Sequence, residues 1–249
     1  MGLGMATYWY ASADKLQALG AYSAGLPGRL RTTLKVGLGG TGMEIGVDAA
    51  AARSLDRAVG KAEKQLHRKG DISDVAAFAS GPPAAVYFRC HGPACRAVVA
   101  GMFWAALVAN EVAVLLVGSA SNAVAAKHYG PDEVFSPSAD PVGAVRHLLR
   151  GIAPEMLAAD DRMHRPSHWQ GYEGPEAQAD TLGYAWNALL RRDLDLVGED
   201  IDALPMAVSV AQYVARYRFN DARHDWRADV NWIVLGTPIY VSQTSKIIN

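Results

Sequence analysis

Residues 97–117 read AVVAGMFWAALVANEVAVLLV, and this stretch decides which fold class the chain can adopt. It is apolar except for Asn110 and Glu111, and it is about as long as a helix that crosses a bilayer. A carboxylate in hydrocarbon costs roughly 2.5 kcal/mol or more, and no matching cluster of Lys and Arg sets an orientation. Valine-rich segments around a polar pair are typical of a buried β-hairpin. We therefore expect two buried strands, Val98–Val108 and Val112–Val117, that reverse near this pair.

Helical periodicity is clearest in two other places. From a cap at Asp48 to about Lys69, apolar residues recur at three- and four-residue spacing, and Gly70 is a natural stop. A second pattern of this kind covers roughly Glu176–Leu196. Both segments are expected to form long helices.

Strands are predicted toward both ends of the chain. Thr7–Tyr10 is a short aromatic strand, and Ser12 is placed to cap a helix that follows it. Ala207–Phe219 alternates in polarity, and Val230–Leu235 and Ile239–Ser242 are expected as strands separated by a Gly-Thr-Pro break. Because strands occur as neighbouring pairs rather than in βαβ alternation, the sequence predicts a single α+β domain over residues 1–249. In that fold a mainly antiparallel sheet packs against the two long helices.

Composition argues against several classes of function. The chain has 249 residues, with 24 Lys and Arg against 25 Asp and Glu, a net charge of -1. A nucleic-acid module normally carries a basic excess, so we expect no nucleic-acid partner. Two cysteines and the lack of a signal peptide at the N-terminus favour a reducing, cytoplasmic compartment. We also expect no membrane partner and no cofactor, and we leave a homo-oligomer open.

Two glycine-containing loops resemble known motifs incompletely. Gly37–Gly42 matches G-x-G-x-x-G, but the following Met43–Val47 looks extended, so an ordinary hairpin turn is the better interpretation. Gly118–Asn122 leaves a buried strand, and Ala120 stands where a hydrolase nucleophile elbow needs serine. Small polar residues directly after a core strand are nevertheless a sensible place to bind an anion or a polar ligand.

Cys90, His91 and Cys95 place two thiols and an imidazole close together in sequence. A structural zinc site needs four ligands, and no second cysteine pair exists, so we expect no metal site. A nucleophilic Cys90 activated by a distant histidine has as little support from the sequence as the zinc site. A buried thiol beside a turn is the simpler interpretation.

The densest cluster of titratable side chains lies in a proline-rich segment. It contains Asp160, Asp161, His164 and His168. Neighbouring carboxylates can perform acid–base chemistry when burial separates their pKa values, although residues in such a loop are usually solvated. The candidate catalytic residues are therefore His91, His164, His168 and Asp161.

Three segments together resemble an uncharacterised actinobacterial family of unknown function. They are Tyr8–Ser12 followed by Lys15, Phe103-Trp104 followed by Leu115–Val124, and Val234–Val241. The resemblance spans essentially the whole chain. It implies an association with predicted bacterial conflict or signalling gene clusters, and it carries over no catalytic residue. Its recurring small-residue loop corresponds here to Ser119–Asn122.

Two hypotheses for function follow. The first is a cytoplasmic module that binds a small molecule or a protein partner where the first strand meets its helix and where the small-residue loop lies. The alternative is a small-molecule enzyme that uses His and Asp acid–base chemistry. The residues expected to bind in the first hypothesis are Tyr8, Ser12, Lys15, Ser119, Ser121 and Asn122.

Overall fold

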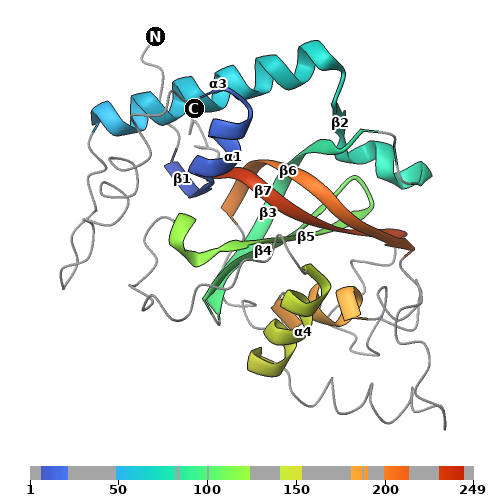
Figure 1. The fold of residues 1–249 in the computed structure, drawn as a ribbon. Coiled ribbons are helices and arrows are strands. Elements are labelled where there is room, and N and C mark those ends of the chain that lie inside the picture. Colours follow the sequence, from blue (N-terminus) through green and yellow to red (C-terminus); the bar gives the residue numbers. More distant parts are fainter. Residues whose placement is uncertain are drawn as a thin grey trace, which may run out of the picture.

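The computed structural model describes residues 7–21, 49–81, 83, 85–99, 101–123, 141–152, 181–186, 188–189, 199–212 and 230–243. Strands dominate these residues, and they form one hydrogen-bonded sheet with helices around it (Figure 1). Gly37–Gly42 and Met43–Val47, for which turns and strands were predicted, lie outside the described residues.

The predicted reversal at Asn110 and Glu111 is confirmed, but its first strand begins at Met102 rather than at Val98, because Val98 and Val99 belong to the preceding strand. β4 (Met102–Ala109) and β5 (Val112–Ser119) pair antiparallel along their whole length. Asn110 and Glu111 form the turn with φ angles of 49° and 64°, the left-handed geometry of a two-residue hairpin loop. Among the described residues, no helix is both long and apolar enough to cross a bilayer.

Five strands close into a barrel. β3 (Tyr87–Val99), β4 and β5 are consecutive antiparallel neighbours, and the connection after β5 brings β6 (Glu199–Gln212) back beside β3. This return is the Greek-key arrangement. β7 (Trp232–Gln243) then pairs antiparallel with β6 and parallel with β5. The ring is therefore β3-β4-β5-β7-β6, a closed five-stranded barrel of the general kind that includes OB-folds.

The predicted fold class, a mainly antiparallel sheet packed against two long helices, is wrong because the sheet closes on itself. The long strand β3 has a neighbour on each edge. Its residue Ala94 pairs with Leu107 of β4 on one side and with Glu199 of β6 on the other, which closes the sheet. The β3–β6 pairing joins residues far apart in sequence, which local periodicity does not reveal. Of the predicted helix Glu176–Leu196, residues 181–186 and 188–189 are helical, and the rest lies outside the described residues.

Two short strands extend the barrel sheet. β1 (Thr7–Ala11) pairs antiparallel with β7, and β2 (Ile72–Asp74) pairs parallel with β3. A 3-10 helix, η1 (Val75–Ser80), follows β2, and the side chain of Asp74 caps it. The predicted break in β7 is absent, because the strand continues through Pro238, which faces Pro205 of β6 at an irregularity in the register.

Apolar side chains from all five barrel strands fill the interior. Alternate residues point inward, as the two-residue period of a strand requires. Large apolar side chains come from all five strands, so the interior of the barrel is a packed core. The interior includes Phe88, Phe103, Leu107, Val114, Leu116, Ile201, Ala203, Val234 and Val241.

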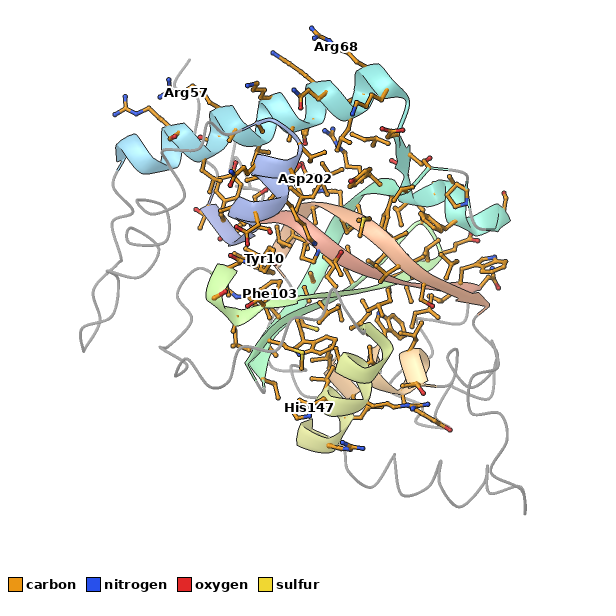
Figure 2. The ribbon with its side chains drawn as sticks, viewed as in Figure 1. Tyr10, Arg57, Arg68, Phe103, His147 and Asp202 are labelled. Carbon is orange, nitrogen blue, oxygen red and sulfur yellow. The ribbon has the colours of Figure 1, made fainter. Side chains whose placement is uncertain are left out.

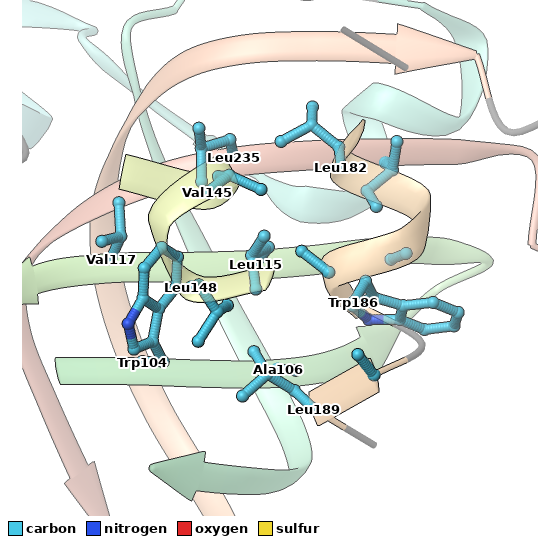
Figure 3. Close-up of a cluster of buried hydrophobic side chains, with 14 of the residues drawn as sticks. Trp104, Ala106, Leu115, Val117, Val145, Leu148, Leu182, Trp186, Leu189 and Leu235 are labelled. Atoms are coloured by element: carbon cyan, nitrogen blue, oxygen red, sulfur yellow. The ribbon is translucent and has the colours of Figure 1, made fainter. Parts of the chain in front are cut away.

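A second apolar layer covers the outer wall of β4 and β5. α4 (Pro141–Ile152) and the helical residues 181–186 and 188–189 pack against this wall, as Figure 3 shows. Trp104 of β4 is fully buried under them. Trp186 donates its indole N–H to the carbonyl oxygen of Leu107 at 3.2 Å, which ties the helical segment to β4.

The predicted helix that ends at Lys69 is confirmed as α3 (Ala49–Lys69). In Figure 1 it lies on the opposite side of the barrel from α4, next to the short α1 (Ala13–Ala18). Its apolar stripe packs against β6, β7 and α1. The residues buried together there include Leu16, Leu55, Val59, Ala62, Leu66, Leu204, Ile239 and Tyr240.

Candidate functional site

The strand-to-helix corner at the start of the chain meets the loop that follows β5. β1 runs alongside β7, and Tyr10 also bridges to Ala123 directly after the short 3-10 helix η2 (Ala120–Asn122). This places two of the predicted segments, Tyr8–Lys15 and Ser119–Asn122, at the same end of the barrel. We call the group Tyr10, Ser12, Lys15, Ser119, Ser121 and Asn122 the polar corner.

Tyr10 stands at the centre of the polar corner. Its ring packs beside that of Phe103, with centroids 5.1 Å apart, and both are labelled in Figure 2. The ring also lies directly on Gly118, where an added Cβ would come within 2.5 Å of ring carbons. Gly118 therefore lacks a side chain for a packing reason, since any other residue would displace Tyr10.

The hydroxyl of Tyr10 reaches the polar groups of the loop. Asn122 donates its side-chain amide to this hydroxyl oxygen at 3.4 Å. Burial raises the pKa of Tyr10 to about 12, and hydrogen bonds with Asn122, Ser12 and the backbone of Ser119 offset part of that rise. At neutral pH the group is a neutral phenol that can donate or accept a hydrogen bond.

The two loop serines are linked to each other. Their hydroxyl oxygens, of Ser119 and Ser121, lie 2.8 Å apart. The Ser119 hydroxyl also accepts from the backbone N–H of Ser121 at 3.4 Å, which caps η2. Ser121 is exposed, and Ser119 and Asn122 are half-buried, so the loop presents hydroxyl and amide groups to solvent.

On the other side of the corner, Ser12 and Lys15 anchor α1. Ser12 is the predicted N-cap, and its hydroxyl accepts from the backbone N–H of Lys15 at 3.4 Å. The amine of Lys15 donates to the carbonyl oxygen of Pro238 at 3.0 Å. Burial lowers the pKa of this amine to about 8. Thr237 precedes Pro238 in the chain, and its hydroxyl is buried and finds no hydrogen-bond partner in the part of the chain that the structure describes.

Tyr8, which was predicted to join this site, points to α3 instead. Its hydroxyl donates to Asp56 at 2.7 Å, and its ring meets that of Tyr240 edge-on. The hydroxyl of Tyr240 donates to Glu63 at 2.5 Å, and Glu63 also pairs with Arg89 at 2.8 Å. These contacts dock α3 on the barrel. Burial and the neighbouring Glu63 carboxylate raise the pKa of Tyr240, so its hydroxyl stays protonated as a donor.

The predicted catalytic candidates are not brought together within the described residues. His91 is exposed on β3, directly opposite Asp202 of β6. His164, His168 and Asp161 lie outside the described residues, as does Asp160.

The two thiols face opposite sides of the barrel wall. Cys90 packs in the interior, whereas Cys95 packs under α4. Burial raises the pKa of Cys90, which argues against a thiolate nucleophile. Among the described residues, no group of His, Cys, Asp and Glu could hold a metal ion.

Sequence reasoning missed Tyr10 and Thr237. Tyr10 was placed correctly in a strand, but nothing local indicates that it enters the barrel end. Its partner Gly118 is far away in sequence, and only the pairing of β1 with β7 brings them into contact. A glycine directly after a run of large apolar residues was the one available signal.

In chemical terms, the polar corner combines three hydroxyls from serine, one phenol, one amide and one amine. Such a set offers donors and acceptors for binding a polar molecule. His91 and Asp202 face each other on β3 and β6, and neither residue belongs to the polar corner.

Comparison with known proteins gives one match. The profile of a family of unknown function, DUF7019, matches residues 7–245, which is nearly the whole chain. No curated protein and no solved structure matches the chain. The expected resemblance to a family of unknown function is thereby confirmed.

Proposed function

Because the chain belongs to the DUF7019 family of unknown function, we propose that it is a binding module whose ligand site is the polar corner. The ligand class that fits best is a small polar molecule with hydrogen-bond acceptors, such as a carboxylate or phosphate. The amine of Lys15, the amide of Asn122 and the hydroxyl of Ser121 supply donors for it, whereas Tyr10 is buried behind them.

The observation that carries this proposal is the placement of Lys15. Its amine is largely buried, and its acceptor among the described residues is the carbonyl oxygen of Pro238. Burying an amine without a counter-charge costs stability, so an ordinary structural position would favour an apolar residue. Thr237, which precedes Pro238 in β7, has a buried hydroxyl that finds no partner among the described residues, and a ligand or water would complete it.

The covered outer face of the barrel favours a ligand site at the end of the barrel over one on its outer face. In OB-fold barrels, oligonucleotides and oligosaccharides bind across the second and third strands. The corresponding strands here are β4 and β5, and α4 with residues 181–186 and 188–189 buries their outer face (Figure 3). The polar corner lies where β5 leaves the barrel, beyond this cover.

An NMR titration tests the proposal. Isotope-labelled protein is titrated with a panel of phosphate, citrate, free amino acids and nucleoside monophosphates. At least one compound is expected to shift the backbone amide signals of Ser12, Ser119 and Asn122 together. The variant Ser119→Ala/Asn122→Ala should weaken that binding at least tenfold, about 1.4 kcal/mol, through loss of hydrogen bonds to the ligand.

A matched control separates binding from folding. Ser80→Ala removes an exposed hydroxyl at the end of η1, away from the polar corner, and should leave both binding and stability unchanged. Unchanged affinity in Ser119→Ala/Asn122→Ala, or ligand shifts confined to other parts of the barrel, would contradict the assignment of the site.

Two finer expectations remain predictions, namely the cytoplasmic location and a role in a bacterial conflict or signalling system. Assembly into a homo-oligomer stays open. The enzymatic alternative keeps one supporting feature, the register pairing of His91 with Asp202. Neither residue has a described link to the polar corner, so we favour binding over catalysis.

A further inference from the structure

α3 has two faces of opposite chemistry. Its inner face carries the apolar residues that pack on the barrel together with both of its acidic residues. Asp56 accepts from Tyr8, and Glu63 accepts from Tyr240 and pairs with Arg89. The negative charges of this helix are therefore directed at the barrel and are bonded there.

The outer face of α3 carries a row of exposed cations. Arg57, Lys61, Lys64 and Arg68 follow one another at spacings of four, three and four residues, which places them on one side of the helix. Figure 2 shows Arg57 and Arg68 projecting from α3 away from the barrel. At 1.5 Å of rise per residue the row is about 17 Å long. We call these four residues the basic row.

The net charge of the whole chain gives no sign of the basic row. α3 contains six Lys and Arg against two acidic residues, a net charge of +4 in a chain whose total is -1. The remainder of the chain therefore carries -5. A polyanion is attracted to α3 and repelled by the rest of the surface, so it would meet the protein in one orientation.

We propose that the basic row binds the phosphodiester backbone of a nucleic acid without reading its sequence. One strand of a duplex presents a phosphate about every 3.4 Å along the axis, so a row of about 17 Å faces about five phosphates. The scaffold is rigid, because apolar packing and the tyrosine–carboxylate bonds fix α3 on the barrel. This inference is independent of the polar corner.

An anionic membrane fits the row less well. Interfacial helices insert an apolar face among the lipid headgroups, whereas the apolar face of α3 is already buried against the barrel. A single row of charges also matches a linear polymer better than a plane. The test must therefore distinguish binding to a nucleic acid from binding to anionic vesicles.

Fluorescence anisotropy tests the proposal. The full chain is titrated into a labelled DNA duplex and, separately, into a labelled single-stranded RNA of equal length. The two titrations show whether the row prefers the phosphodiester backbone of DNA or that of RNA. Four phosphate contacts predict that affinity for the duplex falls about a hundredfold between about 50 mM and about 200 mM salt. The variant Lys61→Gln/Lys64→Gln should reduce the salt slope by about 2 and weaken binding about a hundredfold at low salt.

The control variant removes the same charge elsewhere. Arg146→Gln/Arg150→Gln, on α4 across the barrel, should bind as the original protein does. Glutamine has nearly the helix propensity of lysine and arginine, so folding is preserved, and circular dichroism checks this. If one pair fails to fold, Arg57→Gln/Arg68→Gln tests the same row.

Three results would overturn the proposal. The first is no salt-dependent binding to either nucleic acid. The second is an equal loss in the α4 control, which would indicate a net-charge effect. The third is binding to phosphatidylserine vesicles without binding to nucleic acid, which would assign the row to a membrane surface.

Discussion

Strands β4 and β5 pass through two different environments within a few residues. Along the barrel wall, Trp104 and Leu115 are fully buried beneath α4 and the helical residues 181–186 and 188–189. At the end of β5, Gly118 and Ser119 instead meet the ring of Tyr10 and a group of hydroxyls. The wall gains stability from apolar burial, whereas the polar end includes a half-buried amine and a buried phenol whose charged forms burial disfavours. This difference separates a stabilising apolar wall from the polar end, where we propose the ligand site.

The largest predicted effect is on the wall. Trp104→Ala should lower the free energy of unfolding by about 3 to 5 kcal/mol, because it leaves a cavity under the helices. Chemical denaturation measures this loss. Trp104→Phe should cost distinctly less, since it keeps most of the packing and removes an indole N–H that has no partner among the described residues. A loss below about 1 kcal/mol for the alanine variant would contradict the packed wall.

The next effect is at the polar end. Gly118→Ala should destabilise the protein by about 1 to 3 kcal/mol, because its Cβ would overlap the ring of Tyr10. Combining it with Tyr10→Ala should cost less than the sum of the two single changes, since the smaller residue makes room. Strict additivity in a double-mutant cycle would show that the two residues do not touch.

A smaller, pH-dependent effect belongs to Lys15. Its pKa is about 8 in the folded protein against an ordinary value of 10.5, so between these values the unfolded chain binds more protons. Stability should therefore rise with pH from about 8 to 10.5, by at most about 3 kcal/mol. Tyr10 has the opposite effect above pH 10, because its pKa is raised to about 12. Lys15→Met should remove the rise, and a profile unchanged by this substitution would place its origin elsewhere.

Local patterns predicted the parts of the fold that local interactions determine. The valine-rich segments around Asn110 and Glu111 indicated the hairpin, and the spacing of Leu55, Val59 and Leu66 indicated α3. The cap at Ser12 was also visible in sequence. Each of these depends on residues that are close together in the chain.

Features that depend on distant pairing could not be predicted. Closure of the barrel requires β3 to pair with β6, and a single sequence gives no sign of that contact. For the same reason the contact of Tyr10 with Gly118 was missed, although both neighbouring segments were selected as binding candidates. Net charge carries no information on position, so the average over the chain gives no sign of the basic row on α3. Whether a nucleic acid binds there is what the anisotropy titration tests.

The titration of Lys15 tests the central claim most directly. Carbon-13 NMR of labelled lysine side chains follows each amine through its own pKa, and loss of one signal in Lys15→Met identifies the residue. We predict that Lys15 titrates near pH 8, as a largely buried amine at the polar corner. A value near the ordinary 10.5 would show a solvated side chain, and it would remove the main support for a ligand site at this end of the barrel.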